Sequence, residues 1–464
     1  MYTFASQTKV PDPFCMAESV KIRKGLNIKL KGKAEKVYVD VPISETIALK
    51  PADFTNVRVK LLCKVGDEVK SGTALFSDKD NERVVFTSPV SGEVVEIKRG
   101  AKRKILEVKI LADKEITYEA FKQANPADLS REELIEWLCK SGVWPLIRQR
   151  PFEIIANPED TPKAIFISAF NSAPLAGDND FILHGHGEAF QTGLDAVAKL
   201  SGGKVHLNIN ANATASKVFT NSTGVQINKI SGPHPSGNVG VQIHHLDAVN
   251  KGEVVWHLSP QDVLMIGRLF MEGKYDASRV VALTGSQVKK TRYHKTIIGA
   301  SIKNMIANNL EGEDVRYISG NVLTGTQIDA DGYLGFYDTQ VTVIPEGNQP
   351  TFLGWLAPGF DKFSLSRTFF SWLTPEKEYA LNSNMNGEAR AYVVTGQYEQ
   401  VLPMDIYPVQ MLKAIMIGDV EQLENLGIYE VAEEDLALCE YVCTSKVDVQ
   451  HLIREGLDMV KKEC

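Results

Sequence analysis

Three histidines lie close together in the middle of the sequence, and histidine is the residue best suited to exchange protons near neutral pH. His234, His244 and His245 fall within residues 230–246, a segment dense in glycine and proline. That density predicts a long loop held between regular elements, and such loops often carry function. A neutral imidazole can donate a hydrogen bond to a ligand carbonyl, so these are candidate binding residues. The alternative is a turn in which they only satisfy backbone groups.

Other reactive side chains are placed less favourably. His184 and His186 flank a glycine in a pattern that sometimes binds zinc on a strand. The neighbouring glycines predict a loop instead, and no third ligand follows at a suitable spacing. Cys439 and Cys443 lie one helical turn apart, but an iron–sulfur cluster usually needs four thiolates. The sequence therefore predicts no metal site, and no residue is assigned a catalytic role.

Two basic clusters stand out in an acidic chain. The first runs from Lys21 to Lys36. The second contains Lys98, Arg99, Lys102 and Arg103. Each is either a solvated face of a sheet or a contact surface for anionic lipid headgroups or for an acidic protein partner.

The composition excludes several classes of protein. Of the 464 residues, 44% are hydrophobic and 23% are charged, as in an average globular protein. A formal net charge of −7 does not suggest a nucleic-acid-binding protein. No run of about 18 apolar residues is present to span a membrane. Six scattered cysteines without a C-x-x-C pair indicate reduced thiols in a cytosolic protein.

We expect a multidomain protein that combines β and α/β domains. Residues 1–19 are predicted to form a tail without a signal peptide, within which Met16 is a possible alternative start. Residues 20–112 alternate valine-rich runs with glycine turns, which predicts a small β-sandwich. This pattern resembles the lipoyl-like barrel-sandwich hybrid. Lys79 lies where that family carries a modified lysine, but the polar residues after it favour an unmodified turn.

The remainder alternates strands and helices. Residues 113–258 contain a capping box at Ser130 and Glu133 and a strand–helix–strand pattern, which predicts a Rossmann-like α/β domain with a parallel sheet. Residues 259–373 predict a β-grasp domain of the soluble-ligand-binding type. Residues 374–464 carry repeated helix start and stop signals, the first at Thr374, and predict a C-terminal helical domain.

Several long segments, in order, resemble the A-subunit family of the sodium-translocating NADH:quinone oxidoreductases. They are residues 20–26, 98–103, 231–245, 251–256 and 261–270, and the resemblance extends from about Met16 to Cys464. It implies a complex in a bacterial inner membrane that oxidises NADH, reduces ubiquinone and exports sodium. The A subunit would be its peripheral member on the cytoplasmic side, associated with the quinone end of the electron path.

The resemblance also implies which cofactors this chain lacks. Flavin-binding relatives, such as the flavin subunit of respiratory complex I, carry a glycine-rich loop that corresponds to residues 141–152. Here Trp144 and Phe152 replace glycines, and large side chains obstruct the close backbone approach that a phosphate needs. We therefore expect no tightly bound cofactor on this chain. Flavins, iron centres and the NADH site are expected on the other subunits, B to F.

Two functional hypotheses follow from the resemblance. In the first, an apolar cleft between the α/β and β-grasp domains binds quinone, with His234, His244 or His245 as donors. In the second, the chain is a docking component without a redox centre or substrate contact, and the basic clusters hold it to its partners. In both, it meets the membrane only through partner subunits, and the isolated chain is expected to be inactive.

Overall fold

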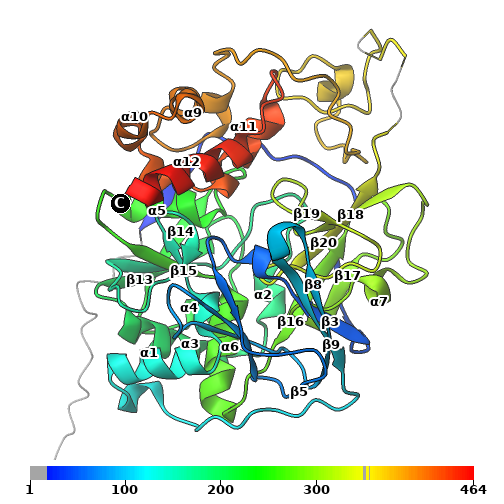
Figure 1. The fold of residues 1–464 in the computed structure, drawn as a ribbon. Helices are drawn as coiled ribbons and strands as arrows, with labels where there is room; N and C mark the ends of the chain where they lie inside the picture. Colours follow the sequence, from blue (N-terminus) through cyan, green and yellow to red (C-terminus); the bar gives the residue numbers. More distant parts are fainter. Residues whose placement is uncertain (1–17, 349–351, 355, 464) are drawn as a thin grey trace, which may run out of the picture.

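The computed structural model describes residues 18–348, 352–354 and 356–463. Most of the predicted tail, the alternative start at Met16, Cys15 and Cys464 lie outside the described residues. Figure 1 shows the helical C-terminal part, in orange and red, at one end of the molecule, with the sheets below it. None of the helices described is both long and apolar enough to cross a membrane.

The N-terminal β domain consists of two small antiparallel sheets around an aromatic core. Phe76 and Phe86 stack with ring centroids 4.6 Å apart, and Phe54 closes the core against both rings. The sheets have the orders β3-β9-β8-β5 and β4-β6-β7. Their strands are β3 (Thr46–Leu49), β4 (Val59–Leu61), β5 (Glu68–Val69), β6 (Ala74–Asp78), β7 (Val85–Thr87), β8 (Gly92–Arg99) and β9 (Ile105–Ala112).

A seven-stranded sheet forms the centre of the α/β domain. Its order is β1-β14-β13-β12-β15-β10-β11, and the strands from β1 to β15 are parallel. Strand β12 is apolar from Ala164 to Ile167 because helices cover both faces of such sheets. The strands are β1 (Ser19–Lys21), β10 (Arg148–Arg150), β11 (Ile154–Ile155), β12 (Ala164–Ser168), β13 (Lys204–Asn210), β14 (Gln226–Ser231) and β15 (Val255–Leu258).

The helices of this domain begin where their capping residues lie. The predicted capping box of Ser130 and Glu133 opens α1 (Arg131–Lys140), and a second one, of Ser259 and Asp262, opens α6 (Pro260–Glu272). The other helices are α2 (Asn179–Ile182), α3 (Gly187–Leu200), α4 (Lys217–Thr220) and α5 (Val239–Asp247).

Helix α6 begins just after residue 258, where we placed the end of the α/β domain, and it packs on α3 of that domain. Two glycines permit this close crossing. A Cβ atom at Gly267 would lie 1.7 Å from the carbonyl oxygen of Ala189, and one at Gly193 would lie 2.1 Å from that of Val263. The backbones of the two helices therefore touch directly.

A six-stranded mixed sheet follows, with the order β19-β18-β20-β16-β17-β2. The predicted strand over residues 279–285 and the strand before Gly320 are present as β16 and β18. The elements are β2 (Glu35–Asp40), β16 (Ser278–Thr284), β17 (Arg292–Ile297), α7 (Lys303–Ile306), β18 (Val315–Ser319), β19 (Thr326–Ile328) and β20 (Gln340–Pro345).

The first two described strands belong to neither small β sheet. Strand β1 pairs with β14 of the seven-stranded sheet, whereas β2 pairs with β17 of the six-stranded sheet. Residues 20–40, which we predicted as part of the barrel-sandwich domain, thus contribute strands to the edges of both larger sheets. Local alternation of side chains predicts a strand but does not specify its partner.

The C-terminal part is helical from residue 398 onward. The helix predicted at Thr374 is wrong, because residues 374–397 form turns and extended segments without a helix. The predicted cap at Asp419 is confirmed, since its carboxylate accepts a hydrogen bond from the Gln422 amide at 3.0 Å. The helices are α8 (Tyr398–Val401), α9 (Pro408–Ile417), α10 (Val420–Asn425), α11 (Ala437–Val442) and α12 (Val449–Glu463).

Candidate functional site

His234 lies in the tight turn between β14 and α5 and is buried. Its Nδ1 atom is 3.1 Å from the Ser172 hydroxyl oxygen, and its backbone N–H donates to the Asn27 side chain at 2.8 Å. Burial lowers the pKa of His234 to about 4. The imidazole is therefore neutral at physiological pH. A neutral imidazole can donate a hydrogen bond to a carbonyl from its protonated nitrogen.

His244 and His245 lie on helix α5, and the prediction of one long loop over residues 230–246 is wrong beyond Asn238. The Asp405 amide donates to Nε2 of His244 at 3.0 Å, so Nδ1 carries the proton and donates to Glu430 at 2.6 Å. His245 donates from Nε2 to the Pro403 carbonyl at 2.8 Å. Both histidines thus fasten the end of α5 to the C-terminal part.

The three histidines do not converge on one point. The rings of His244 and His245 meet edge to face with centroids 5.2 Å apart. His234 instead contacts residues 27 and 172, and within the described ranges no hydrogen bond or ring contact joins it to the other two. The structure places these predicted site residues in two separate polar settings.

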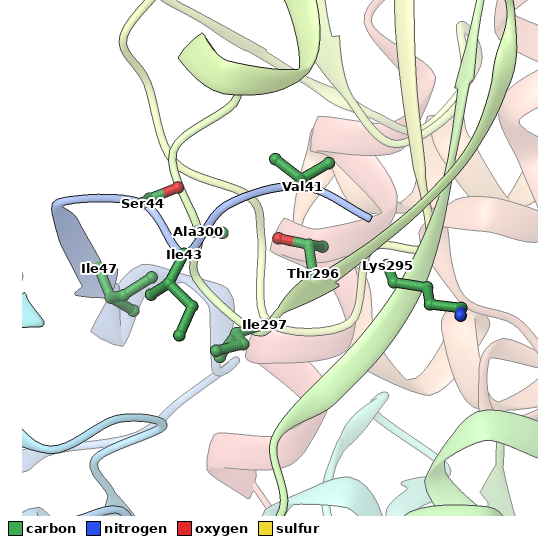
Figure 2. A pocket seen from close by; sticks show the side chains of 8 residues that line it. All are labelled: Val41, Ile43, Ser44, Ile47, Lys295, Thr296, Ile297 and Ala300. Atoms are coloured by element: carbon green, nitrogen blue, oxygen red, sulfur yellow. The ribbon is translucent and has the colours of Figure 1, made fainter. Parts of the chain in front are cut away.

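A ring-sized pocket lies between the N-terminal β domain and the six-stranded sheet, and sequence reasoning missed it (Figure 2). The connection from β2 to β3 forms one wall and the end of β17 the other. Its volume is about 170 Å³. It is lined by Val41, Ile43, Ser44, Ile47, Lys295, Thr296, Ile297 and Ala300.

The polar groups of this pocket are few and well separated. The Ser44 hydroxyl donates to the Ser301 carbonyl at 3.2 Å. Lys295 points away from the isoleucines in Figure 2, and its amine pairs with Asp40 at 3.3 Å. The Thr296 hydroxyl turns toward Ala300 in the same view. The pocket thus offers an apolar wall and a hydroxyl donor, and its volume is comparable to cavities of about 150 Å³ that hold benzene.

Residues 141–152, which we expected to correspond to a flavin-binding loop, are filled by their own side chains. Trp144 is fully buried, meets Trp256 edge to face at 5.5 Å, and donates to the Ala156 carbonyl at 2.7 Å. The rings of Phe152 and Tyr429 meet edge to face with their centroids 6.1 Å apart. The bulky residues in this segment are therefore part of the packed interior.

A buried cluster of charges lies next to that segment and was not predicted. Arg150 forms ion pairs with Glu153 at 2.5 Å, with Glu434 at 2.8 Å and with Asp435 at 2.9 Å. Burial alone would raise the pKa of Glu153, but Arg150, His257 and Arg148 outweigh it and hold that pKa well below its usual range. Residues 284 positions apart form the cluster, so no local spacing announces it.

The basic residues of the second cluster occupy the exposed tip of the β8–β9 hairpin. Lys98 lies 3.6 Å from Glu107, and Arg99 donates to the Arg103 carbonyl at 3.4 Å. Lys102 and Arg103 have φ values of 52° and 61° in the turn, and neither forms an ion pair with any residue that the structure describes. Their charges are thus free to meet another molecule.

No group of three or more metal-ligating side chains occurs within the described residues. The thiols of Cys439 and Cys443 are free and buried between helices of the C-terminal part. Burial raises the pKa of the Cys439 thiol far above its ordinary value. It is therefore a packed thiol and not a thiolate.

These features define a multidomain α/β protein built on a barrel-sandwich hybrid domain. Family models match its parts in order. The model of the NqrA N-terminal barrel-sandwich hybrid domain matches residues 20–113. The model of the NqrA second alpha/beta domain matches residues 129–275, and the model of the NQRA C-terminal domain matches residues 280–330.

Whole-length relatives agree with the family models. A protein of Photorhabdus laumondii is 39% identical over 96% of this chain and 100% of its own length. Proteins of Neisseria meningitidis and Pasteurella multocida match the same shares at 39% and 38% identity. All three are named as the A subunit of the Na(+)-translocating NADH-quinone reductase, and the chain belongs to this family.

Solved structures show only a distant likeness. An NAD+-reducing [NiFe]-hydrogenase in its air-oxidized state is 12% identical, with a TM-score of 0.36 over 66% of this chain and 55% of its own. The H2-reduced state gives 11% identity and a TM-score of 0.34. At these scores we draw no conclusion from the likeness.

Proposed function

We propose that this chain is the peripheral A subunit of a complex that oxidises NADH, reduces quinone and exports sodium ions. The observation that carries this is 39% identity over the full length of relatives with that name. The complex would lie in a bacterial inner membrane, with this chain on the cytoplasmic side. Subunits B to F would hold the flavins, iron centres and NADH site, and the isolated chain would have no activity.

Within that complex, we propose that the pocket between the β2–β3 connection and the end of β17 contacts the quinone ring. Ubiquinone joins a flat, largely apolar ring with two carbonyl acceptors to an apolar tail. Ile47, Ile297 and Ala300 supply an apolar wall. The side-chain hydroxyl of Thr296 has no hydrogen-bond partner among the residues described, so it is available to a carbonyl. Ile43 is partly exposed at the pocket, which gives the tail a way out.

The histidines are the second candidate for quinone contact. The Nε2 atom of His234 and the Nδ1 atom of His245 have no hydrogen-bond partner among the residues described. Only Nε2 of His234 can donate to a quinone carbonyl, because the neutral ring of His245 carries its proton on Nε2 and its Nδ1 can only accept. His244 has both ring nitrogens engaged, so a ligand would have to displace Glu430 or the Asp405 amide.

A calorimetric titration of the purified chain with a short-tailed ubiquinone separates these sites. We expect one-to-one binding that is lost in Ile297→Trp, which fills the pocket, and retained in His234→Ala and His245→Ala. Leu62→Trp, an exposed position in the N-terminal β domain, is the control for the added indole. Binding that survives Ile297→Trp but is lost in His234→Ala would replace the pocket with the histidine site.

A docking role without substrate contact is the alternative function. It is favoured by the unpaired Lys102 and Arg103 at the hairpin tip. If the isolated chain binds no quinone, and Ile297→Trp leaves quinone reduction by the assembled complex unchanged, the docking role replaces quinone binding.

The finer domain assignments belong to the same proposal. The strand order β14-β13-β12-β15 of the parallel core supports a Rossmann-like domain over residues 113–258. The mixed sheet with α7 supports a β-grasp domain within residues 259–373. Helices α8 to α12 support a helical domain within residues 374–464.

A further inference from the structure

A loop near the C-terminal part exposes an unusual number of large apolar side chains. We name residues 352–354 and 356–373 the aromatic loop. Phe352 is 91% exposed, Phe370 is 51% exposed and Trp372 is 52% exposed. A concentration of exposed apolar side chains of this kind marks a protein or membrane interaction site. Its other exposed apolar residues are Leu353, Leu356, Phe360 and Leu373.

The base of the aromatic loop is held by specific contacts, so its exposure is not the result of an unfinished core. Phe363 packs on the buried Tyr379 with ring centroids 5.8 Å apart. The Tyr379 hydroxyl donates to the Ser371 carbonyl at 3.3 Å, and Lys362 donates to the Gly354 carbonyl at 3.2 Å. These contacts anchor the polar backbone and leave the large rings outside.

The charges around the aromatic loop leave a positive surplus. Asp361 is paired with Lys377 at 2.5 Å, and Glu376 is paired with Lys29 at 3.1 Å. Arg367 and Lys31 are exposed and form no ion pair with the described part of the chain, against one exposed carboxylate, Glu378, that likewise has no ion-pair partner there. The Lys31 amide donates to the Tyr379 carbonyl at 3.0 Å, which places the first basic cluster beside the base of the loop.

We propose that the aromatic loop inserts into the headgroup region of an anionic lipid bilayer, with Arg367 and Lys31 facing lipid phosphates. Exposed phenylalanine and tryptophan next to unpaired cations is the composition of surfaces that lie at the membrane interface. The described backbone of the aromatic loop contains one short 3-10 helix, Phe370–Leu373, and is otherwise irregular, without a strand edge for a protein partner to extend. The inference rests on the proposed membrane complex, and it differs from the expectation that partner subunits make all membrane contact.

The test is flotation of the purified chain with vesicles. One set contains phosphatidylcholine alone, and the other contains equal amounts of phosphatidylcholine and phosphatidylglycerol. We expect binding to the anionic vesicles that weakens as salt is raised. Phe370→Ser/Trp372→Ser should weaken partitioning about tenfold or more, because two large apolar side chains no longer leave water. Arg367→Gln/Lys31→Gln should remove the preference for anionic lipid.

The matched control is Leu62→Ser/Val65→Ser, which removes two side chains that are 49% and 59% exposed in the N-terminal β domain. It should bind vesicles as the parent chain does, and thermal unfolding should confirm that all variants fold. A parent chain that ignores anionic vesicles, or an aromatic variant that still binds them equally, overturns the proposal. So does retention on the membrane subunits in detergent through this loop without vesicle binding. None of these results depends on quinone binding.

Discussion

Arg150 and Asp435 are 285 positions apart in the chain, yet Nη1 of the arginine lies 2.9 Å from Oδ2 of the aspartate in a fully buried salt bridge. The pair joins strand β10, next to the edge strand β11 of the α/β sheet, to the segment just before α11. Glu153 and Glu434 also form ion pairs with the arginine. The C-terminal helices are thereby tied to the sheet through a charge network, in addition to apolar packing.

Asp435→Ala should lower the free energy of unfolding by about 1–3 kcal/mol, because it removes the carboxylate that accepts hydrogen bonds from Nη1 of Arg150 and from the Ala432 amide in the buried interior. Urea unfolding measures the change. Asp80→Ala, which breaks the exposed pair with Arg58, is the control and should cost no more than about 1 kcal/mol. Equal effects of the two substitutions would show that the buried network does not hold the C-terminal helices in place.

His294 should make the fold sensitive to mild acid. It is buried on β17, neither ring nitrogen has a hydrogen-bond partner within the described residues, and burial lowers its pKa to about 4. The unfolded chain takes up this proton near pH 6.5. The stabilisation is therefore complete above pH 6.5 and is lost as the pH falls toward 4, by up to about 3 kcal/mol.

His294→Leu should remove this part of the acid dependence and raise stability at pH 5 relative to the parent. Urea unfolding at pH 5 and pH 7.5 gives the comparison. His451→Gln, at an exposed position on α12, is the control and should leave the dependence unchanged. A His294→Leu protein that loses as much stability between the two pH values as the parent would contradict the argument. Burial also lowers the pKa of His234 to about 4, so the His294→Leu protein will still lose some stability in acid.

Gly267→Ala should separate α6 from α3. The added Cβ would lie 1.7 Å from the Ala189 carbonyl oxygen, closer than any van der Waals contact allows, so one helix must move. We expect a loss of about 2–3 kcal/mol in unfolding free energy, as for other overpacked sites. At Gly187, in the first turn of α3, a Cβ would meet nothing within 4 Å, so Gly187→Ala is the matched control. It should be neutral or slightly stabilising.

Charge reversal at the hairpin tip tests the docking surface. Lys102→Glu/Arg103→Glu removes no ion pair with the described residues, so the melting temperature should stay within about 2 °C of the parent. If the tip holds an acidic partner, co-purification of the chain with the membrane subunits should fall at least tenfold. Lys64→Glu/Lys70→Glu, on another turn of the same domain, controls for the change in net charge. Undiminished co-purification would show that docking does not use the hairpin.

Local patterns in the sequence predicted the helices whose first residues include recognisable capping residues. The capping box predicted at Ser130 marks a true helix start, because the contacts that define it are three residues apart. Helix α5 was not predicted, because the glycine- and proline-rich residues 232–237 just before it indicated a loop that continued to residue 246. Its signal was present: Asn238 at the N-cap position, then Val239, Ile243 and Leu246 on one face.

Features formed by segments far apart in the chain could not be predicted from the sequence. The partners of β1 and β2 lie more than two hundred residues away, and no local spacing encodes them. The pocket between the β2–β3 connection and β17 and the charge cluster around Arg150 have the same origin, since each exists only after two domains pack. The family resemblance predicted what kind of protein this is, whereas the locations of its cavity and its buried charges needed the structure.

The pairing of Ser19 with Lys229 has a consequence for synthesis on the ribosome. The N-terminal strands emerge first, but their partners follow only after roughly 10–40 s of translation at about 5–20 residues per second. During that interval the barrel-sandwich domain can close by itself, while β1 and β2 wait with unpaired backbone edges. Such edges recruit other chains. The nascent polypeptide is thus most prone to aggregation before residue 297 has left the exit tunnel, and a chaperone that covers its first forty residues would protect it best.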